Sequence, residues 1–488
     1  MEKVSKNQFA DNALWKFLEI IVRKVISLII STIIARLLVP EAYGVVALTT
    51  VFITFSDIFI LNGFNIAIIR KERVEDEDFS TVMILSLGFS LIIYLILFFA
   101  APVLASFYKS PELKSVLRVI TILIFFQSVA TVIRAKGTRE LQFKKMSLVT
   151  IIGSVAASII GLIMAYKGFG VWALVAQQVL SNFFDMVLMA VIFHWKFICK
   201  FSMKRAKEMV KFTLGVLGAS FLDFLGNNAN SLVIGKAYSP TELAYYNRGN
   251  MYPETISLNT YNSINSVLLP TLATRQNDIA EMKRIVRKVI ALTEYIIIPM
   301  MFGLLAVSDR FVPVLLTTRW SSCIPIMICA CVTYAINPIR AIGYSVFYAR
   351  GESRRSVRIE LVRSITMLLN LVITIVLLKK SIYVLAASNV IITLLVAITT
   401  QIQVKQCIHY QFRELAIDLM PTLLMSGVMV LLVRLITFIT IPDAAILVLQ
   451  LFVGFLAYMV MSVISKNKNF FFLYNYIKKK IKISRRKR

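Results

Sequence analysis

The sequence predicts an all-α polytopic membrane protein with about 14 transmembrane helices. Three observations predict this class. The 488-residue chain is 58% hydrophobic, whereas soluble domains contain about 45–50% apolar residues. Its mean hydropathy is +0.76. Its apolar runs of roughly 20–27 residues have the length of a bilayer-spanning helix, and Lys and Arg gather in alternate loops between them.

The first six expected spans fill the chain up to a basic stretch near residue 200. Each is an apolar run closed by charged residues or by a tight turn, and a turn at Pro40 separates the first span from the second. The expected limits are 14–38, 42–68, 80–106, 115–133, 146–166 and 170–193.

The later spans continue this pattern, although the seventh, eighth and tenth are rich in polar residues. Six of them are expected at 212–235, 246–272, 289–307, 322–349, 359–378 and 382–403. The last two, at 415–437 and 442–464, precede a basic tail.

Basic residues predict the orientation of the spans. With the N-terminus in the cytoplasm, most Lys and Arg residues fall on the cytoplasmic side, and the tail falls there too. Trp15 and Trp195 then lie at the inner interface, and Trp172 and Trp320 at the outer one. Basic loops on an anionic lipid surface account for the net charge of +28, so nucleic acid is not an expected partner.

The loops are too short for a soluble catalytic domain. No phosphate-binding G-x-x-x-x-G-K-[ST] motif occurs. The five cysteines are odd in number and lie mostly in apolar runs, and the two histidines, His194 and His409, flank apolar segments. We therefore expect no disulfide framework, metal site, cofactor or catalytic residue, and no enzymatic activity.

Short matches at a nearly constant offset predict an internal repeat. The segment IIARLLVPEAYG (33–44) matches VIGKAYSPTELA (233–244), and two weaker matches follow in the same order. Two parallel six-helix lobes with a site between them are a transporter plan. The expected domains are an N-terminal lobe at 1–200, a C-terminal lobe at 201–410, two extra spans at 411–465 and a basic cytoplasmic tail at 466–488.

Several longer segments carry a family resemblance over roughly residues 10–410. They are LLVPEAYGVVAL, IIRKERVEDEDFSTV, RELQFKKMSLV, GFGVWALVAQQ and AYYNRGNMYPETISLNTYNSINSVLLPTLATRQND. On these segments the chain resembles the polysaccharide transporter family of the multidrug/oligosaccharidyl-lipid/polysaccharide exporter superfamily. Within that family it is most similar to the lipopolysaccharide, colanic acid and teichuronic acid flippases.

The resemblance implies a V-shaped pair of helical lobes that works by alternating access. It implies transport of an undecaprenyl-pyrophosphate-linked oligosaccharide across the bacterial inner membrane for surface polysaccharide biosynthesis. The implied partners are this lipid-linked substrate, membrane lipids, and polysaccharide polymerase and export machinery. The family's cavity carries basic residues on its first helix, and Arg23 and Lys24 are the matching positions here.

The first span carries a polar stripe that a lipid-facing helix would not tolerate. Its members recur every three or four residues and therefore share one helix face: Lys16, Glu19, Arg23, Ser27 and Ser31, with Lys24 at the edge. Lys16 can reach the inner interface, and Glu19 can simply neutralise Arg23. The alternative is that Arg23 lines a water-filled path and binds phosphate.

Other polar residues inside spans complete the expected substrate site. The seventh span places Asp223 and Asn227 on one face, and either an interhelical hydrogen bond or ion binding explains such residues. The remaining candidates are Asp57, Asn62, Asn65, Arg248, Asn262, Asn265 and Arg340.

Three other functions remain open at this point. A multidrug or cation antiporter of the same superfamily would favour an acidic cavity, and a glycan ligase or polymerase would need larger outer loops. A scaffold without transport is the third alternative. The transported glycan, the coupling ion, the oligomeric state and the type of cell envelope leave no readable pattern in the sequence.

Overall fold

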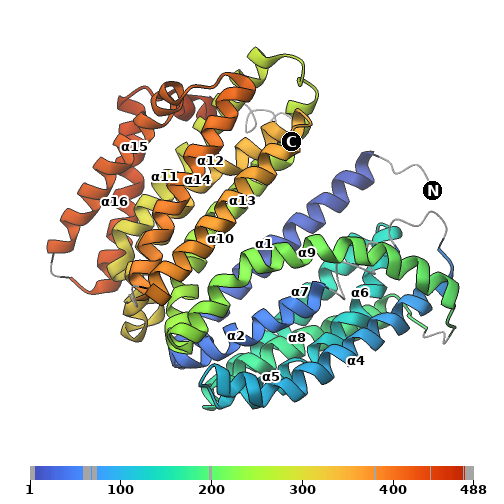
Figure 1. The fold of residues 1–488 in the computed structure, drawn as a ribbon. Coiled ribbons are helices and arrows are strands. Elements are labelled where there is room, and N and C mark those ends of the chain that lie inside the picture. Colours follow the sequence, from blue (N-terminus) through green and yellow to red (C-terminus); the bar gives the residue numbers. More distant parts are fainter. Residues whose placement is uncertain are drawn as a thin grey trace, which may run out of the picture. The chain divides into compact units, whose positions relative to one another are not determined.

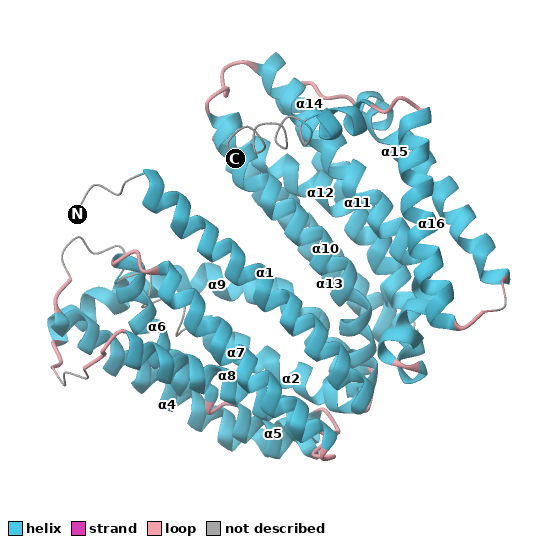
Figure 2. Ribbon diagram, turned by 180° about the vertical axis from the view of Figure 1, so that it is seen from behind, coloured by secondary structure: helices cyan, strands magenta, loops and turns pink. Residues whose placement is uncertain are grey.

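The computed structural model describes residues 6–58, 68, 74–196, 200–377, 381–439, 441–475 and 478 of the chain, with some side chains inside helices left out. Every regular element in this part is a helix, as Figure 2 shows. The chain divides into two compact units, Met1–Ala244 and Tyr245–Arg488.

In the described part of the first unit, one helix, α5, is short and the others are longer. Figure 1 shows their arrangement within the unit. The helix α7 forms a hairpin with α8, while α1 packs on α7 and α9 packs on α2. The bounds are α1 Lys6–Leu37, α2 Pro40–Asp57, α4 Asp76–Phe107, α5 Glu112–Ile120, α6 Leu123–Arg139, α7 Phe143–Tyr166, α8 Val171–Ile192 and α9 Met203–Ala237.

The fourth expected span, 115–133, lies inside the segment Glu112–Arg139, which is long and apolar enough to cross a membrane. Two helices, α5 and α6, cover it, and a turn at Thr121 and Ile122 separates them. The Thr121 hydroxyl donates to the Leu117 carbonyl at 2.7 Å, which is the kind of side-chain bond that competes with the backbone of a helix. The apolar run from 115 to 133 gave no sign of this break because the turn is made of residues that also occur in helices.

The predicted repeat of a helix, a proline turn and a helix is present at both places. The helix α1 ends at Leu37 and α2 begins at Pro40, while α9 ends at Ala237 and α10 begins at Pro240. Proline suits the first turn of a helix because its missing N–H has no acceptor there. The two turns touch, since a Cβ placed on Gly44 would lie 1.8 Å from the Pro240 carbonyl oxygen.

The second unit consists of α10, which begins in the first unit, and the helices that follow it (Figure 1). The helix α11 packs on α12 and α15, and α12 packs on α14. The bounds are α10 Pro240–Ala273, α11 Ile279–Leu316, α12 Ile324–Ala349, α13 Ser353–Leu371, α14 Ile382–Ile408, α15 Phe412–Leu435 and α16 Asp443–Ile464, with a 3-10 turn (η2) at Thr318–Cys323 and a π-helical turn (η3) at Val372–Leu377.

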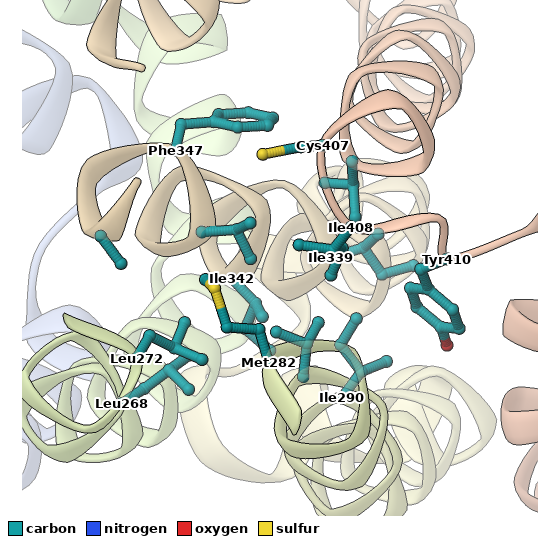
Figure 3. Packing of buried hydrophobic residues seen from close by; sticks show 14 of the residues in the cluster. Leu268, Leu272, Met282, Ile290, Ile339, Ile342, Phe347, Cys407, Ile408 and Tyr410 are labelled. Carbon is teal, nitrogen blue, oxygen red and sulfur yellow. The ribbon is translucent and has the colours of Figure 1, made fainter. Parts of the chain in front are cut away.

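A continuous apolar core holds these helices together near their basic ends. Figure 3 shows Met282 and Ile290 of α11 among side chains of α10, α12 and α14. Tyr410, which is fully buried, adds a hydroxyl that donates to Asp418 at 2.8 Å. Cys407 lies in this core as a free thiol.

Nine helical segments in the described part are long and apolar enough to cross a membrane. The chain is therefore a multi-pass membrane protein, while the count of 14 spans stays a prediction. The helices α1, α4, α9, α10 and α11 have 32 to 38 residues and exceed the expected span lengths. A tilted helix or one that extends beyond the bilayer accommodates the excess.

Candidate functional site

The members of the charged stripe of α1 differ in burial. Glu19 is buried, with 2% of its surface exposed, and it accepts a hydrogen bond of 2.8 Å from the Ser147 hydroxyl of α7. Arg23, Lys24 and Ser27 are exposed. The side of α1 that meets α7 thus contains the acid, and the cations lie outside that contact.

The neutralisation of Arg23 by Glu19 stays a prediction, as does the binding of phosphate by Arg23. Arg23 lies 14 residues before the end of α1 at Leu37, which is about 21 Å along a helix. In the predicted span 14–38, that position would lie inside the roughly 30 Å hydrocarbon core. An exposed guanidinium at this depth requires water or an anion, because lipid tails solvate neither its charge nor its N–H groups.

The remaining site candidates of the first unit are only partly described. Asp57 is the last residue of α2 and is half-buried, and its Oδ1 has no hydrogen-bond partner among the described residues. Asn62 and Asn65 lie outside the described residues. The side chains of Asp223 and Asn227 in α9 are also outside the description, so these four remain predictions.

The sequence reading missed a second charged group in the first unit. The Arg134 guanidinium of α6 donates to Asp185 of α8 at 2.6 Å, and the Thr150 hydroxyl of α7 donates to the same carboxylate at 3.1 Å. This network joins three helices and leaves Asp185 13% exposed. Asp185 stands alone in an apolar run of the sequence, and that isolation was the available signal.

In the second unit, Arg340 lies in a polar group that we name the Arg340 cluster: Asn337, Arg340, Tyr344, Glu360 and Arg363. The Arg340 guanidinium donates to the Asn337 side chain at 2.9 Å and 3.1 Å and contacts the Glu360 carboxylate at 3.5 Å. Arg363 donates to Glu360 at 2.6 Å, and Tyr344 donates at 2.9 Å.

The Arg340 cluster contains two cations and one acid, so it carries a net positive charge. All three charged side chains keep 24% to 39% of their surface exposed. Guanidinium groups with this exposure retain N–H donors that can bind a phosphate or sugar oxygen. The sequence singled out Arg340 alone. Asn337 and Tyr344 lie on the same helix, α12, but the charged members Glu360 and Arg363 lie on the next helix, α13, at a spacing that no local pattern reports.

Two of the expected amides on α10 have different surroundings. Asn265 of α10 accepts a hydrogen bond from the Ser345 hydroxyl of α12. The nearby Tyr261 hydroxyl of α10 donates to the Ala341 carbonyl of α12 at 3.3 Å. Asn265 and Tyr261 therefore connect α10 to α12. Asn262 is exposed together with Asn259 and Ser263. The equal spacing of the two expected amides therefore does not give them equal roles.

Arg248 is buried rather than exposed. Only 5% of its surface is accessible, and its guanidinium lies 5.1 Å from the ring centre of Trp320, within cation–π range. It also lies 3.5 Å from the Met251 sulfur. These contacts fasten α10 to the 3-10 turn η2.

Comparisons with known proteins show which proteins the chain is similar to. A family model described as "Polysaccharide biosynthesis protein" matches residues 33–325. The chain is 25% identical to the succinoglycan biosynthesis transport protein of Rhizobium meliloti over 60% of each chain. It is 21% identical to a lipopolysaccharide biosynthesis protein of Escherichia coli over 68% of this chain and 67% of that protein.

The teichuronic acid biosynthesis protein of Bacillus subtilis is 22% identical, over 61% of this chain and 62% of that protein. The matched region thus spans about six tenths to two thirds of these curated relatives.

Solved structures with the same fold are transporters. A lipid II flippase in an inward closed conformation is similar with a TM-score of 0.70 at 16% identity, over 93% of this chain and 98% of that one. An inward-facing multidrug resistance transporter reaches a TM-score of 0.56 at 15% identity, over 80% of this chain and 96% of that one. At these identities the likeness establishes the fold.

Proposed function

This chain belongs to the polysaccharide biosynthesis protein family, and from that premise we propose that it is a flippase for an undecaprenyl-pyrophosphate-linked oligosaccharide. It moves this lipid from the inner to the outer leaflet of the bacterial inner membrane by alternating access, for surface polysaccharide biosynthesis. The names of the curated relatives, which include a transport protein for succinoglycan biosynthesis, support the proposal.

One observation carries the proposal. Arg23 and Lys24 are exposed on α1 inside the predicted span, while the acid of the same stripe, Glu19, is buried against α7. A pyrophosphate cannot cross hydrocarbon because desolvation of its charges costs far too much. A face of α1 that carries two cations can replace the lost hydration, and the fork of Arg23 can donate two parallel hydrogen bonds to a phosphate.

The glycan needs different contacts from the phosphate. We assign it to the exposed polar residues of the second unit, which are the Arg340 cluster and the stretch of α10 around Asn262. Amides, hydroxyls and guanidinium groups can bind sugar hydroxyls. Such contacts tolerate different sugars, which is consistent with a family whose relatives serve different polysaccharides.

Further parts of the proposal follow from charge. The basic loops orient both chain ends towards the cytoplasm. An inside-negative potential assists outward movement of an anion by about 2.3 kcal/mol per charge per 100 mV. Polysaccharide polymerase and export machinery would receive the product at the outer face.

A strain without this protein tests the function in the cell. We expect completed lipid-linked repeat units to accumulate on the inner leaflet, where a membrane-impermeant enzyme added from outside does not reach them. The intact chain should restore their exposure. Accumulation of complete units on the outer leaflet would contradict the proposal, because a missing polymerase or ligase has that effect.

A further inference from the structure

A carboxyl group with no partner lies in the interior of the second unit. Glu294 of α11 has 1% of its surface exposed, and neither of its carboxyl oxygens has a hydrogen-bond partner among the described residues. An ionised carboxylate without a partner in such a place is very costly, so the group is held neutral or finds compensation. Buried acids in membrane helices are usually functional.

The position of Glu294 relative to α15 follows from two contacts. Near the start of α11, Arg287 donates to Asp418 of α15 at 2.8 Å, and the two residues are 131 apart in the sequence. Near its end, the Leu305 carbonyl of α11 accepts from Arg434 of α15 at 3.5 Å, and these residues are 129 apart. The two helices therefore run side by side in parallel. A shift of about 130 residues places Glu294 at the level of residues 422–426.

Helix periodicity places Glu294 on the side of α11 that meets α15. It follows Arg287 by seven residues, so the two share one helix face. On α15, Ser426 follows Asp418 by eight residues and lies near the same face. The hydroxyls of Ser426 and of Thr293, next to Glu294, are fully buried and also have no partner among the described residues.

The charged groups on the helices that pack against α11 already have partners. Lys283 and Arg287 bind Glu414, and Arg287 also binds Asp418. On α12 and α16, Arg340 contacts Glu360 and Tyr458 donates to the Tyr295 carbonyl at 2.9 Å. The helix α10 also packs against α11, through Tyr252 and Phe311. The remaining titratable groups of all these elements lie elsewhere along them or are thiols and phenols. They are Arg319, Cys323, Cys329, Cys331, Tyr334, Tyr344 and Tyr348 of η2 and α12, Tyr383, Lys405 and Cys407 of α14, Tyr410 and Arg413 beside α15, Arg434 with Asp309, Asp443 with Arg310, and Glu242, Tyr245, Tyr246, Arg248, Tyr252, Glu254 and Tyr261 of α10.

The chemistry of this place favours a proton over a metal cation. A sodium or calcium ion needs a cage of several oxygen ligands, and no group of three or more acidic, His or Cys side chains occurs in the described part. A proton needs one carboxylate. The buried Ser426 hydroxyl of α15, on the same level, is suited to donate to that carboxylate when the proton leaves.

We propose that Glu294 is a proton-binding site in the second unit, and that proton uptake and release there is a step of the transport cycle. Uptake forms an O–H bond on a carboxylate oxygen and removes the negative charge. Release breaks that bond and leaves a carboxylate, to which the Ser426 hydroxyl of α15 is placed to donate. The proposal that Glu294 binds a proton rests on the packing of α11 and α15. The proposal that this proton is part of the transport cycle rests on the proposed function.

Infrared difference spectroscopy tests the proton site without any substrate. The protein in liposomes at neutral pH is compared with Glu294→Gln, which keeps the shape of a protonated carboxyl group. It is also compared with Glu281→Gln, which changes a partly exposed acid at the start of the same helix. We expect the carbonyl band of a protonated carboxylic acid in the wild type and in Glu281→Gln, and its loss in Glu294→Gln. Identical spectra for the wild type and Glu294→Gln would overturn the site.

Transport of a labelled lipid-linked oligosaccharide under an imposed pH gradient tests the coupling. The wild type and Glu281→Gln should respond to the gradient, and Glu294→Gln should lose at least most of that response. A full response in Glu294→Gln would refute the coupling. If the wild type moves no substrate under any gradient, the proposed function and the coupling both fail, while the infrared band still decides the proton site.

Discussion

Single charges decide what the exposed side of α1 can do. Arg23 and Lys24 are exposed there, and Glu19 is withdrawn into the contact with Ser147. The cations and the acid of the stripe thus differ in their exposure to the surroundings of α1. The same principle applies to the Arg340 cluster, where one acid is shared by two guanidinium groups and a phenol.

Glu360→Gln should destabilise the second unit. The change removes the carboxylate that receives hydrogen bonds from Arg340, Arg363 and Tyr344, and hydrogen bonds to charged groups contribute roughly 1.5–3 kcal/mol each where they are shielded from water. Since these side chains are partly exposed, we expect a loss of about 1–2 kcal/mol in the free energy of unfolding. Thermal unfolding in detergent measures it.

The matched control for this change is Glu112→Gln. Glu112 is exposed in the first turn of α5, so we expect a change within about 0.5 kcal/mol. Equal midpoints for the two variants would mean that Glu360 does not hold the Arg340 cluster together.

At the residue scale, periodicity predicted which side chains share a face but not which of them are buried. In the stripe of α1, Glu19 and Arg23 are four residues apart and share a helix face. Their surroundings differ because α7 covers only part of the helix. Isolated acids in apolar runs, such as Asp185 and Glu294, were readable signals that the sequence reading passed over. Glu360 and Arg363 required knowledge of the neighbouring helix.

The paired proline turns determine how closely helices approach at the end of α1. Gly44→Ala should be strongly destabilising, because the new Cβ would lie 1.8 Å from the backbone oxygen of Pro240, which cannot move aside as a flexible side chain can. Overpacking costs about 1–3 kcal/mol or more. The amount of folded protein in the membrane and its unfolding temperature are the measurements.

The control is Gly88→Ala in α4, where nothing lies within 4 Å of the added Cβ. Alanine is the better helix former, so we expect this variant to be at least as stable as the wild type. Normal stability of Gly44→Ala would show that the two turns do not touch.

The ion pair between α11 and α15 fastens the helices that lie beyond the predicted repeat. Asp418→Asn should lower the free energy of unfolding by about 1–3 kcal/mol, because Arg287 loses a two-pronged partner and the Tyr410 hydroxyl loses its charged acceptor. Asp443→Asn removes an acid that is 54% exposed and pairs with Arg310 at 2.6 Å. It should cost less than about 1 kcal/mol, and equal losses would contradict the account.

At the element scale, apolar length predicted most helices and failed at their ends. The turn at Thr121 and the extension of α11 to Leu316 leave the local composition apolar, so the sequence contains no boundary signal there. The turns at Pro40 and Pro240 were predicted correctly because proline constrains the backbone itself.

For the whole molecule, composition was enough to predict an all-helical membrane protein, and the match over residues 33–325 establishes its family. The predicted domain limits differ from the contact-based division at Ala244, since α9 packs on α2 and α4. The lobes of six spans stay a prediction. The glycan could not be predicted, because hydrogen bonds to sugars use common side chains without a fixed spacing.

The most direct test of the central claim is the movement of a labelled undecaprenyl-pyrophosphate oligosaccharide between leaflets of liposomes that contain the wild type, Arg23→Ala or Arg284→Ala. Arg284 is an 81% exposed arginine near the start of α11 and serves as the control. We expect transport by the wild type and by Arg284→Ala. Arg23→Ala should be about 10- to 100-fold slower, the equivalent of one or two charge-assisted hydrogen bonds. Transport by Arg23→Ala at the wild-type rate would contradict the role of the α1 face, and no transport by the wild type under any gradient would contradict the flippase itself.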